Sequence, residues 1–184
     1  MYKLCKTERS AKRQREIELA FLKLMETTPY SDISVTMLCQ SIGIPRKAFY
    51  RYFDTKEDAL HALIDHTLAE CDVLIAAKAP LKARVESVVL FVKRQKPLLD
   101  ALAKNDLLCP LSSITAQHPA ENPELLASVF STEPEWVRPT LARFAAAGFA
   151  SLVLEWHKNG FDKTVGEMTD IAYRLLARPL CQTT

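Results

Sequence analysis

The stretch that decides the fold is residues 36–60, which reads TMLCQSIGIPRKAFYRYFDTKEDAL. Ser34 is placed to cap a short helix directly after it, and Gly43 follows that helix, where it would supply a left-handed turn. Pro45 opens a second short helix, which we expect to run over residues 46–53. Two helices of about seven residues cannot each bury a face alone, so they must pack on each other and on a neighbour. The spacing therefore predicts a helix-turn-helix.

Apolar residues at helical spacing predict further helices on both sides of this motif. The stripes run over residues 17–25, 60–75, 85–92, 98–102, 141–156 and 168–176. Prolines at 29, 80 and 97 end or break three of them, and the proline-containing residues 104–123 are expected to form a loop. The last two stripes predict an antiparallel helical hairpin, whose second helix opens with a capping box at Thr164 and Glu167.

Glycine is scarce in this chain, which has four in 184 residues where average usage predicts about 13. No glycines stand at the G-x-G-x-x-G or G-x-x-x-x-G-K-[ST] spacing, so both phosphate-binding fingerprints are excluded. No Asn-Gly, Asp-Gly or Gly-Gly pair occurs, which argues against a sheet of tight hairpins. Together with the stripes, this composition predicts an all-α protein.

Charge is unevenly distributed along the chain, although the net charge is only +2. Residues 1–56 hold eleven basic and six acidic side chains, a balance of +5, whereas residues 57–184 have a balance of −3. A basic N-terminal segment followed by a mildly acidic remainder suggests a polyanion-binding region joined to a region of different function. Such a basic segment is, however, often only a solvated surface.

Several protein classes are disfavoured by what the sequence lacks. The first fifteen residues contain no apolar run of the kind found in secretory signals. The most apolar uncharged run, residues 144–154, is shorter than the roughly 20 residues that a membrane helix needs. The five cysteines form no C-x-x-C pair, which is typical of reduced thiols. We therefore expect a soluble, cytoplasmic protein.

The titratable residues show no pattern typical of a metal site or of catalysis. His61 and His66 are five residues apart on a predicted helix, which places them roughly 140° around it, so they cannot share a metal ion. No Ser-His-Asp, Cys-His or paired-carboxylate arrangement can be argued from spacing. We expect no enzymatic activity, no metal and no cofactor.

The second helix of the motif carries the candidate chemistry. With Leu38, Ile42, Ile44 and Phe49 committed to the interior, its remaining side chains are those of Arg46, Lys47, Ala48, Tyr50 and Arg51. Arginine can bind a guanine edge through two hydrogen bonds, while tyrosine and lysine can reach phosphates. This helix is therefore the candidate recognition helix of a DNA-binding protein.

Residues 36–60 resemble the DNA-binding domain of the tetracycline-repressor (TetR) family. A Gly turn, an aromatic Tyr-x-x-Phe run and a Lys that opens the fourth helix are matched here by Gly43, Tyr50, Phe53 and Lys56. The match covers about residues 10–65, and the C-terminal part is similar to the family's more variable regulatory domain. The resemblance implies a helix-turn-helix DNA-binding domain over residues 1–55 and a helical effector-binding and dimerisation domain over residues 56–184.

The resemblance also implies roles for individual residues. Tyr50 and Lys56 would hold phosphates, and Thr36 and Tyr52 would support the backbone contacts. Arg46, Lys47 and Ala48 would face base edges. Lys12 would lie near the adjacent phosphates or the minor groove. The chain departs from the family at Pro45, where many members carry Ser or Thr, which puts one phosphate contact in doubt.

The predicted regulatory domain would bind a small-molecule effector and form the homodimer. Candidate effector-pocket residues are Phe91, Gln95, His118, Phe130 and Trp136, each of which could equally belong to the core. Candidate dimer-interface residues are Phe144, Gly148, Phe149, Leu152, Trp156, Ile171 and Leu175.

The resemblance implies a dimeric transcriptional regulator, more commonly a repressor, that an effector releases from a near-palindromic operator. Two alternatives stay open. One is a protein-interaction module of the same fold that does not read DNA, which the basic residues 1–56 disfavour. The other is a small helical enzyme or carrier, which the lack of a catalytic group disfavours.

Overall fold

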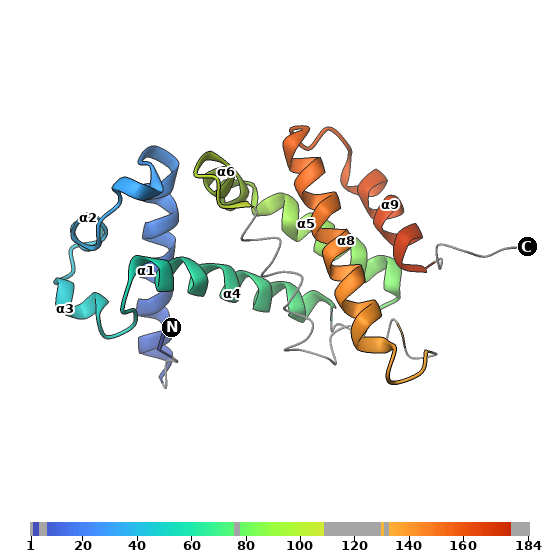
Figure 1. The fold of residues 1–184 in the computed structure, drawn as a ribbon, viewed down its shortest axis with the longest axis horizontal. Coiled ribbons are helices and arrows are strands. Elements are labelled where there is room, and N and C mark those ends of the chain that lie inside the picture. The colour runs from blue at the N-terminus through green and yellow to red at the C-terminus, as the bar shows by residue number, and fades with distance from the viewer. Residues whose placement is uncertain (1, 4–6, 76–77, 109–129, 131–132, 178–184) are drawn as a thin grey trace, which may run out of the picture. The chain divides into compact units, whose positions relative to one another are not determined.

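The computed structural model describes residues 2–3, 7–75, 78–108, 130 and 133–177 (Figure 1). Within these ranges every regular element is helical and no strand occurs, as the composition predicted. The chain forms two compact units. We call them the N-terminal unit, Met1–Leu68 with Pro97–Leu107, and the C-terminal unit, Ala69–Lys96 with Leu108–Thr184.

Helix α1 (Glu8–Thr27) opens the N-terminal unit and ends ahead of Pro29, as expected. It begins at a capping box in which the Ser10 N–H donates to Thr7 Oγ1 at 3.2 Å. A single 3₁₀ turn, η1 (Tyr30–Asp32), leads to α2 (Val35–Ser41), which packs on α1. The Met37 N–H donates to Ser34 Oγ at 3.2 Å, so the predicted N-cap of α2 is confirmed.

The turn after α2 has the left-handed geometry that the sequence predicted, because Gly43 has a φ of +65°. Helix α3 (Arg46–Phe49) follows, and it is shorter than the expected 46–53. Pro45 is its N-cap and not its first helical residue. Beyond Phe49 the chain continues in tighter turns, because it must change direction before α4 begins.

The core of the N-terminal unit consists of apolar side chains from residues 17–64 and from α6 (Lys96–Lys104). Its largest fully buried members are Ile17, Phe21, Met25, Ile33, Leu38, Phe49, Phe53, Leu63 and Leu102. Phe49 and Phe53 pack with their ring centroids 5.3 Å apart, which holds the end of α3 against the interior. Burial of each such side chain stabilises the fold by about 1.5–3 kcal/mol, and this packing compensates for the shortness of α2 and α3.

Helix α4 (Lys56–Ile75) begins at a capping box formed by Thr55 and Asp58. The Asp58 N–H donates to Thr55 Oγ1, and the Thr55 N–H donates to Asp58 Oδ2, both at 3.1 Å. Helix α5 (Leu81–Arg94) follows and is capped by Gln95, so the predicted break before residue 98 is confirmed. Helix α6 (Lys96–Lys104) carries Pro97 in its first turn.

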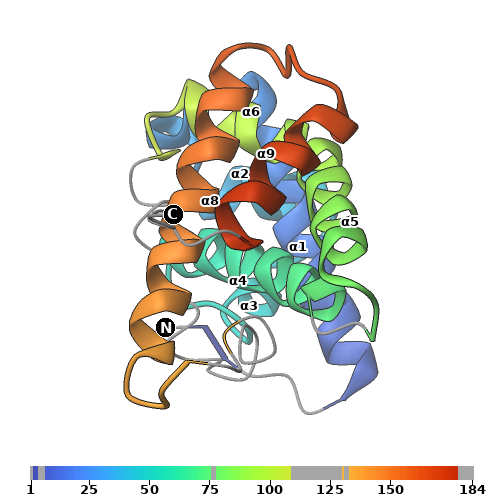
Figure 2. The same ribbon diagram turned by 90° about the vertical axis from the view of Figure 1, so that its right-hand side faces the viewer.

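The C-terminal unit is completed by α8 (Arg138–Lys158) and α9 (Val165–Ala177). Helix α9 packs against both α5 and α8 (Figure 2). Their buried side chains include Val85, Val88, Trp156, Met168 and Ala172. Most of the expected loop over residues 104–123 lies outside the described residues.

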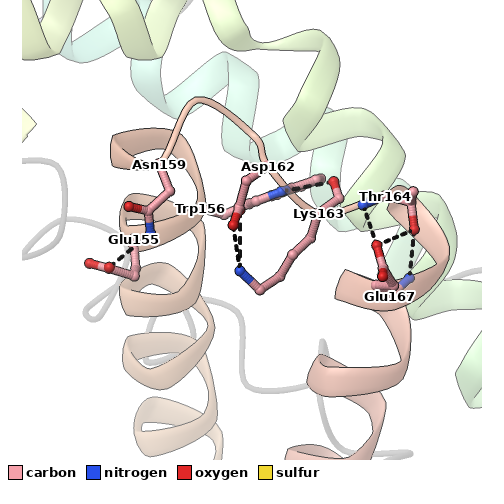
Figure 3. Close-up of polar contacts among 7 residues, drawn as sticks. All are labelled: Glu155, Trp156, Asn159, Asp162, Lys163, Thr164 and Glu167. Carbon is pink, nitrogen blue, oxygen red and sulfur yellow. Dashed lines mark hydrogen bonds and ion pairs between the residues drawn. The ribbon is translucent and has the colours of Figure 1, made fainter.

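A compact corner joins α8 to α9 (Figure 3). The indole N–H of Trp156 donates to the Lys163 carbonyl at 3.1 Å, and its ring lies 4.7 Å from that of Phe161. The Thr164 N–H donates to Glu167 Oε2 at 2.8 Å, and the Glu167 N–H donates back to Thr164 Oγ1 at 3.2 Å. The predicted capping box is therefore confirmed at the start of α9.

Candidate nucleic-acid interface

The basic side chains predicted on the recognition helix lie at the surface. Arg46 and Lys47 on α3, and Arg51 directly after it, are exposed, whereas Ala48 is half-buried. None of these three cations takes part in an ion pair among the residues that the structure describes. The arrangement leaves positive charge available to a polyanion.

Arg46 and Tyr50 lie one helical turn apart and contact each other. A guanidinium nitrogen of Arg46 donates to the Tyr50 hydroxyl at 3.0 Å, and the guanidinium carbon lies 5.8 Å from the ring centroid. Tyr50 is 40% exposed, so its hydroxyl proton can still reach an acceptor in solution. This contact orients Arg46, which the sequence alone did not predict.

The other predicted DNA contacts come from three different elements. Lys12 is exposed on α1 and Thr36 is exposed on α2. Tyr52 is half-buried, with its ring 6.3 Å from that of Phe53. Their roles toward DNA stay predictions, since the structure contains the protein alone.

Lys56 is half-buried, and its ammonium group has protein partners throughout. Its Nζ donates to the carbonyl oxygens of Tyr30, Ser31 and Ile33 at 2.7, 3.3 and 3.1 Å. The same nitrogen lies 4.5 Å from the centroid of the Tyr30 ring. Sequence reasoning treated this lysine as a phosphate ligand and missed these contacts.

Tyr30 connects the segment before α2 to two other helices. Its hydroxyl donates to Glu57 Oε1 at 3.0 Å, and its N–H donates to Asn105 Oδ1, just after α6, at 2.6 Å. Burial, reinforced by the Glu57 carboxylate, raises the pKa of the Tyr30 phenol well above its usual range. No local motif marks these residues, because their partners are distant in sequence.

Lys3 contacts the backbone directly after the end of α3. Its Nζ donates to the Tyr50 carbonyl at 2.9 Å and lies 3.1 Å from Asp54 Oδ1, while its backbone N–H donates to the Tyr52 carbonyl at 2.9 Å. A cation suits the partial negative charge at a helix C-terminus. The excess of basic residues near the N-terminus was the only sequence signal for this contact.

The candidate effector-pocket residues come from different segments and differ in exposure. Phe91 and Gln95 are half-buried at the end of α5, and Phe130 is half-buried. Trp136, in the turn before α8, is 83% exposed, and His118 lies outside the described residues.

The candidate dimer-interface residues divide into exposed and buried positions. Phe144 is 64% and Leu175 is 49% exposed, and Gly148 is exposed as well. The half-buried members are Phe149, Leu152 and Ile171. Trp156 is 2% exposed and belongs to the core of its own unit.

Within the part of the chain that the structure describes, no group of three or more His, Cys, Asp or Glu residues could hold a metal ion. None of the helices in that part is long and apolar enough to cross a membrane.

The chain is similar in sequence to several curated proteins, although no protein-family model matches it. It is 39% identical over 66 residues to the HTH-type transcriptional regulator EthR of Mycobacterium tuberculosis, covering 34% of this chain and 31% of that protein. It is 37% identical over 57 residues to the HTH-type dhaKLM operon transcriptional activator DhaS of Lactococcus lactis, covering 31% of this chain and 30% of DhaS. The chain therefore spans about a third of the length of these relatives.

Solved structures share the fold over most of the chain. The dihydroxyacetone kinase operon activator DhaS superposes with a TM-score of 0.64 at 19% identity, covering 89% of this chain and 93% of that one. A transcriptional regulator of the TetR/AcrR family from Thermobifida fusca superposes with a TM-score of 0.50 at 21% identity, covering 93% and 100%. The chain is thus similar to HTH-type transcriptional regulators in sequence over about a third of its length, and it shares the fold of a TetR/AcrR-family regulator over most of it.

Proposed function

We propose that this protein is a sequence-specific DNA-binding transcriptional regulator. The observation that carries the proposal is the exposure of Arg46, Lys47 and Arg51 at the second helix of a helix-turn-helix. Similarity to proteins named as HTH-type transcriptional regulators supports it. In this role the start of α3 enters the major groove, and the cations contact base edges and phosphates. No catalytic group, metal or cofactor is needed, and the protein acts in the cytoplasm.

The proposed active form is a homodimer that binds a near-palindromic operator. Phe144 on α8 and Leu175 on α9 are large apolar side chains at the surface of the C-terminal unit. Burying them against a second copy would remove apolar area from water, which favours association. Two-fold symmetry then places two recognition helices in successive major grooves.

A small-molecule effector is the proposed signal, bound in a helical domain over residues 56–184, while residues 1–55 form the DNA-binding domain. An effector that prefers the conformation with lower DNA affinity by about 1–3 kcal/mol releases the operator. We propose repression as the sign of regulation. A reporter gene behind the operator tests it, because deletion of the regulator raises expression for a repressor and lowers it for an activator such as its relative DhaS.

Fluorescence anisotropy tests the DNA-binding function directly. The probe is DNA from upstream of the protein's own gene, and the control is a scrambled duplex of equal length and composition, each at two salt concentrations. The proposal expects tight binding with preference for the native fragment and weaker binding at higher salt. Absence of binding to either duplex by a folded dimer would contradict it and favour a protein-interaction module.

A further inference from the structure

Lys56 lies at the N-terminus of a helix, where the helix dipole disfavours a positive charge. It is the first residue of α4, and the unpaired N–H groups of a helix N-terminus carry partial positive charge. A lysine that only stabilised this helix would be better placed in its last turn. The position therefore needs a partner that compensates for the unfavourable charge.

The structure supplies that partner from the protein itself. An ammonium group has three N–H donors and no acceptor, and the carbonyl oxygens of Tyr30, Ser31 and Ile33 lie at 2.7, 3.3 and 3.1 Å from it. The face of the Tyr30 ring lies against the same cation. A phosphate oxygen could bind Lys56 only by displacing one of these carbonyls.

The three carbonyls belong to the segment that leads into α2. Tyr30 and Ser31 lie in η1, and the buried Ile33 directly precedes Ser34, the N-cap of α2. Lys56 therefore holds the point at which the first helix of the helix-turn-helix begins.

The next two residues of α4 complete the arrangement. Glu57 Oε1 accepts a hydrogen bond of 3.0 Å from the hydroxyl of Tyr30, which belongs to the same segment that Lys56 contacts. Asp58 accepts the N–H groups of Asp54 and Thr55 at 3.2 and 3.1 Å, in the turn that leaves α3. One helical turn thus holds both the entry to α2 and the exit from α3.

We propose that Lys56 is a positioning residue, which fixes the entry to α2 through three backbone carbonyls, and is not a ligand of a DNA phosphate. This inference rests on the proposed DNA-binding function for its consequence, but its structural basis is independent of DNA. Loss of Lys56 lowers operator affinity by disturbing the helix-turn-helix, while the number of phosphate contacts stays the same.

The salt dependence of DNA binding separates the two roles. Lys56→Met keeps most of the apolar stem and removes the ammonium group. Lys47→Met is the matched control, because it removes an exposed cation of α3 that the proposed function places against DNA. We expect Lys56→Met to weaken binding to the upstream fragment about tenfold with the slope of log Kd against log salt unchanged, whereas Lys47→Met flattens that slope by about one unit. A slope flattened equally by Lys56→Met would overturn the proposal.

Amide hydrogen exchange of the free protein tests the same proposal without DNA. We expect Lys56→Met to speed exchange in residues 30–37 about tenfold and to leave α8 and α9 unchanged. Unchanged exchange in residues 30–37 would overturn the positioning role. If the wild-type protein binds no DNA, the proposed function fails while this measurement still decides the role of Lys56.

Lys56→Arg provides a variant that keeps the charge, in case the methionine variant does not fold. A planar guanidinium directs its donors into a fork and cannot reproduce three converging ammonium bonds, but it binds phosphates well. We expect faster exchange in residues 30–37 and lower operator affinity. Wild-type exchange together with wild-type affinity would overturn the proposal.

Discussion

The candidate functional surfaces of the two units differ in chemistry. The N-terminal unit presents Arg46, Lys47 and Arg51 at α3, whereas the C-terminal unit presents Phe144 and Leu175 on α8 and α9. Cations attract a polyanion over a distance of several ångströms, while apolar side chains gain free energy only when a closely fitting surface covers them. This difference underlies the proposals that the first surface binds DNA and that the second binds another copy of the chain.

The units also differ in what holds their helices. Helix α3 has four residues and α2 has seven, so both depend on contacts outside their own hydrogen bonds; α2 has a side-chain cap at Ser34, whereas α3 is held by the burial of Phe49 and by the contacts of Lys3 after its end. Helix α8 has 21 residues and α9 has 13, and their packing places Trp156 in the interior. The recognition surface therefore depends on polar contacts at helix ends as well as on the apolar core beneath it, whereas the long helices of the C-terminal unit are held mainly by apolar packing.

The largest effect is expected from removing the buried indole of the C-terminal unit. Trp156→Ala should lower the free energy of unfolding by about 3–5 kcal/mol, because it leaves a cavity and removes the hydrogen bond to Lys163. Chemical denaturation followed by circular dichroism measures the change. Trp136→Ala, at a position 83% exposed, is the matched control and should stay within about 0.5 kcal/mol of wild type. Equal effects of the two changes would contradict this account of the core.

A smaller effect is expected at the recognition helix, on DNA binding and not on folding. Arg46→Ala should cost about 1–3 kcal/mol of binding free energy on the operator and relax the base preference. Arg94→Ala removes the same charge from an exposed position at the end of α5 and should leave binding nearly unchanged. Anisotropy with operator and scrambled DNA gives both values. Equal losses on both duplexes would show that Arg46 does not read bases.

Removing an exposed apolar side chain from the C-terminal unit should weaken dimerisation. Phe144→Ala should weaken the dimer by about 1–2 kcal/mol, which raises its dissociation constant roughly five- to thirtyfold. Val73→Ala, at a residue 70% exposed on α4, is the control and should have little effect. Sedimentation equilibrium measures the dissociation constants. If Val73→Ala weakens the dimer and Phe144→Ala does not, the interface lies elsewhere.

The smallest effect is expected from a titratable contact inside the N-terminal unit. His66 Nδ1 lies 2.9 Å from both carboxylate oxygens of the buried Glu18, and this hydrogen bond raises the pKa of His66, while burial and the nearby Arg15 oppose the shift. Because the folded-state pKa is above the unfolded one, the stabilisation is full below about pH 6.5 and is lost as the pH rises through the folded-state value.

Denaturation at about pH 6 and about pH 8 checks this contact. The unfolding free energy should be lower at the higher pH for wild type, and His66→Asn should reduce that difference. His61→Asn, on the exposed side of the same helix, is the control and should keep it. A pH dependence that survives unchanged in His66→Asn would assign it to other groups.

Much of the fold could be predicted because its signals are local. Ser34, Gly43 and the pairs Thr55–Asp58 and Thr164–Glu167 act on atoms within four residues of themselves, so their spacing alone indicates where helices begin and end. The length of α3 was overestimated because the apolar pattern continues to Phe53. That pattern cannot distinguish a regular helix from the tighter turns that the start of α4 imposes.

The all-α class, the helix-turn-helix and the basic residues on its second helix follow from local sequence, because helical period, caps and turns are properties of short segments. The contacts between residues distant in sequence come from the tertiary structure. It gave Lys56 its partners 23 to 26 positions earlier, and it buried Trp156 while leaving Trp136 at the surface. The path of the folded chain determines which segments meet, and no local pattern of residues records that path.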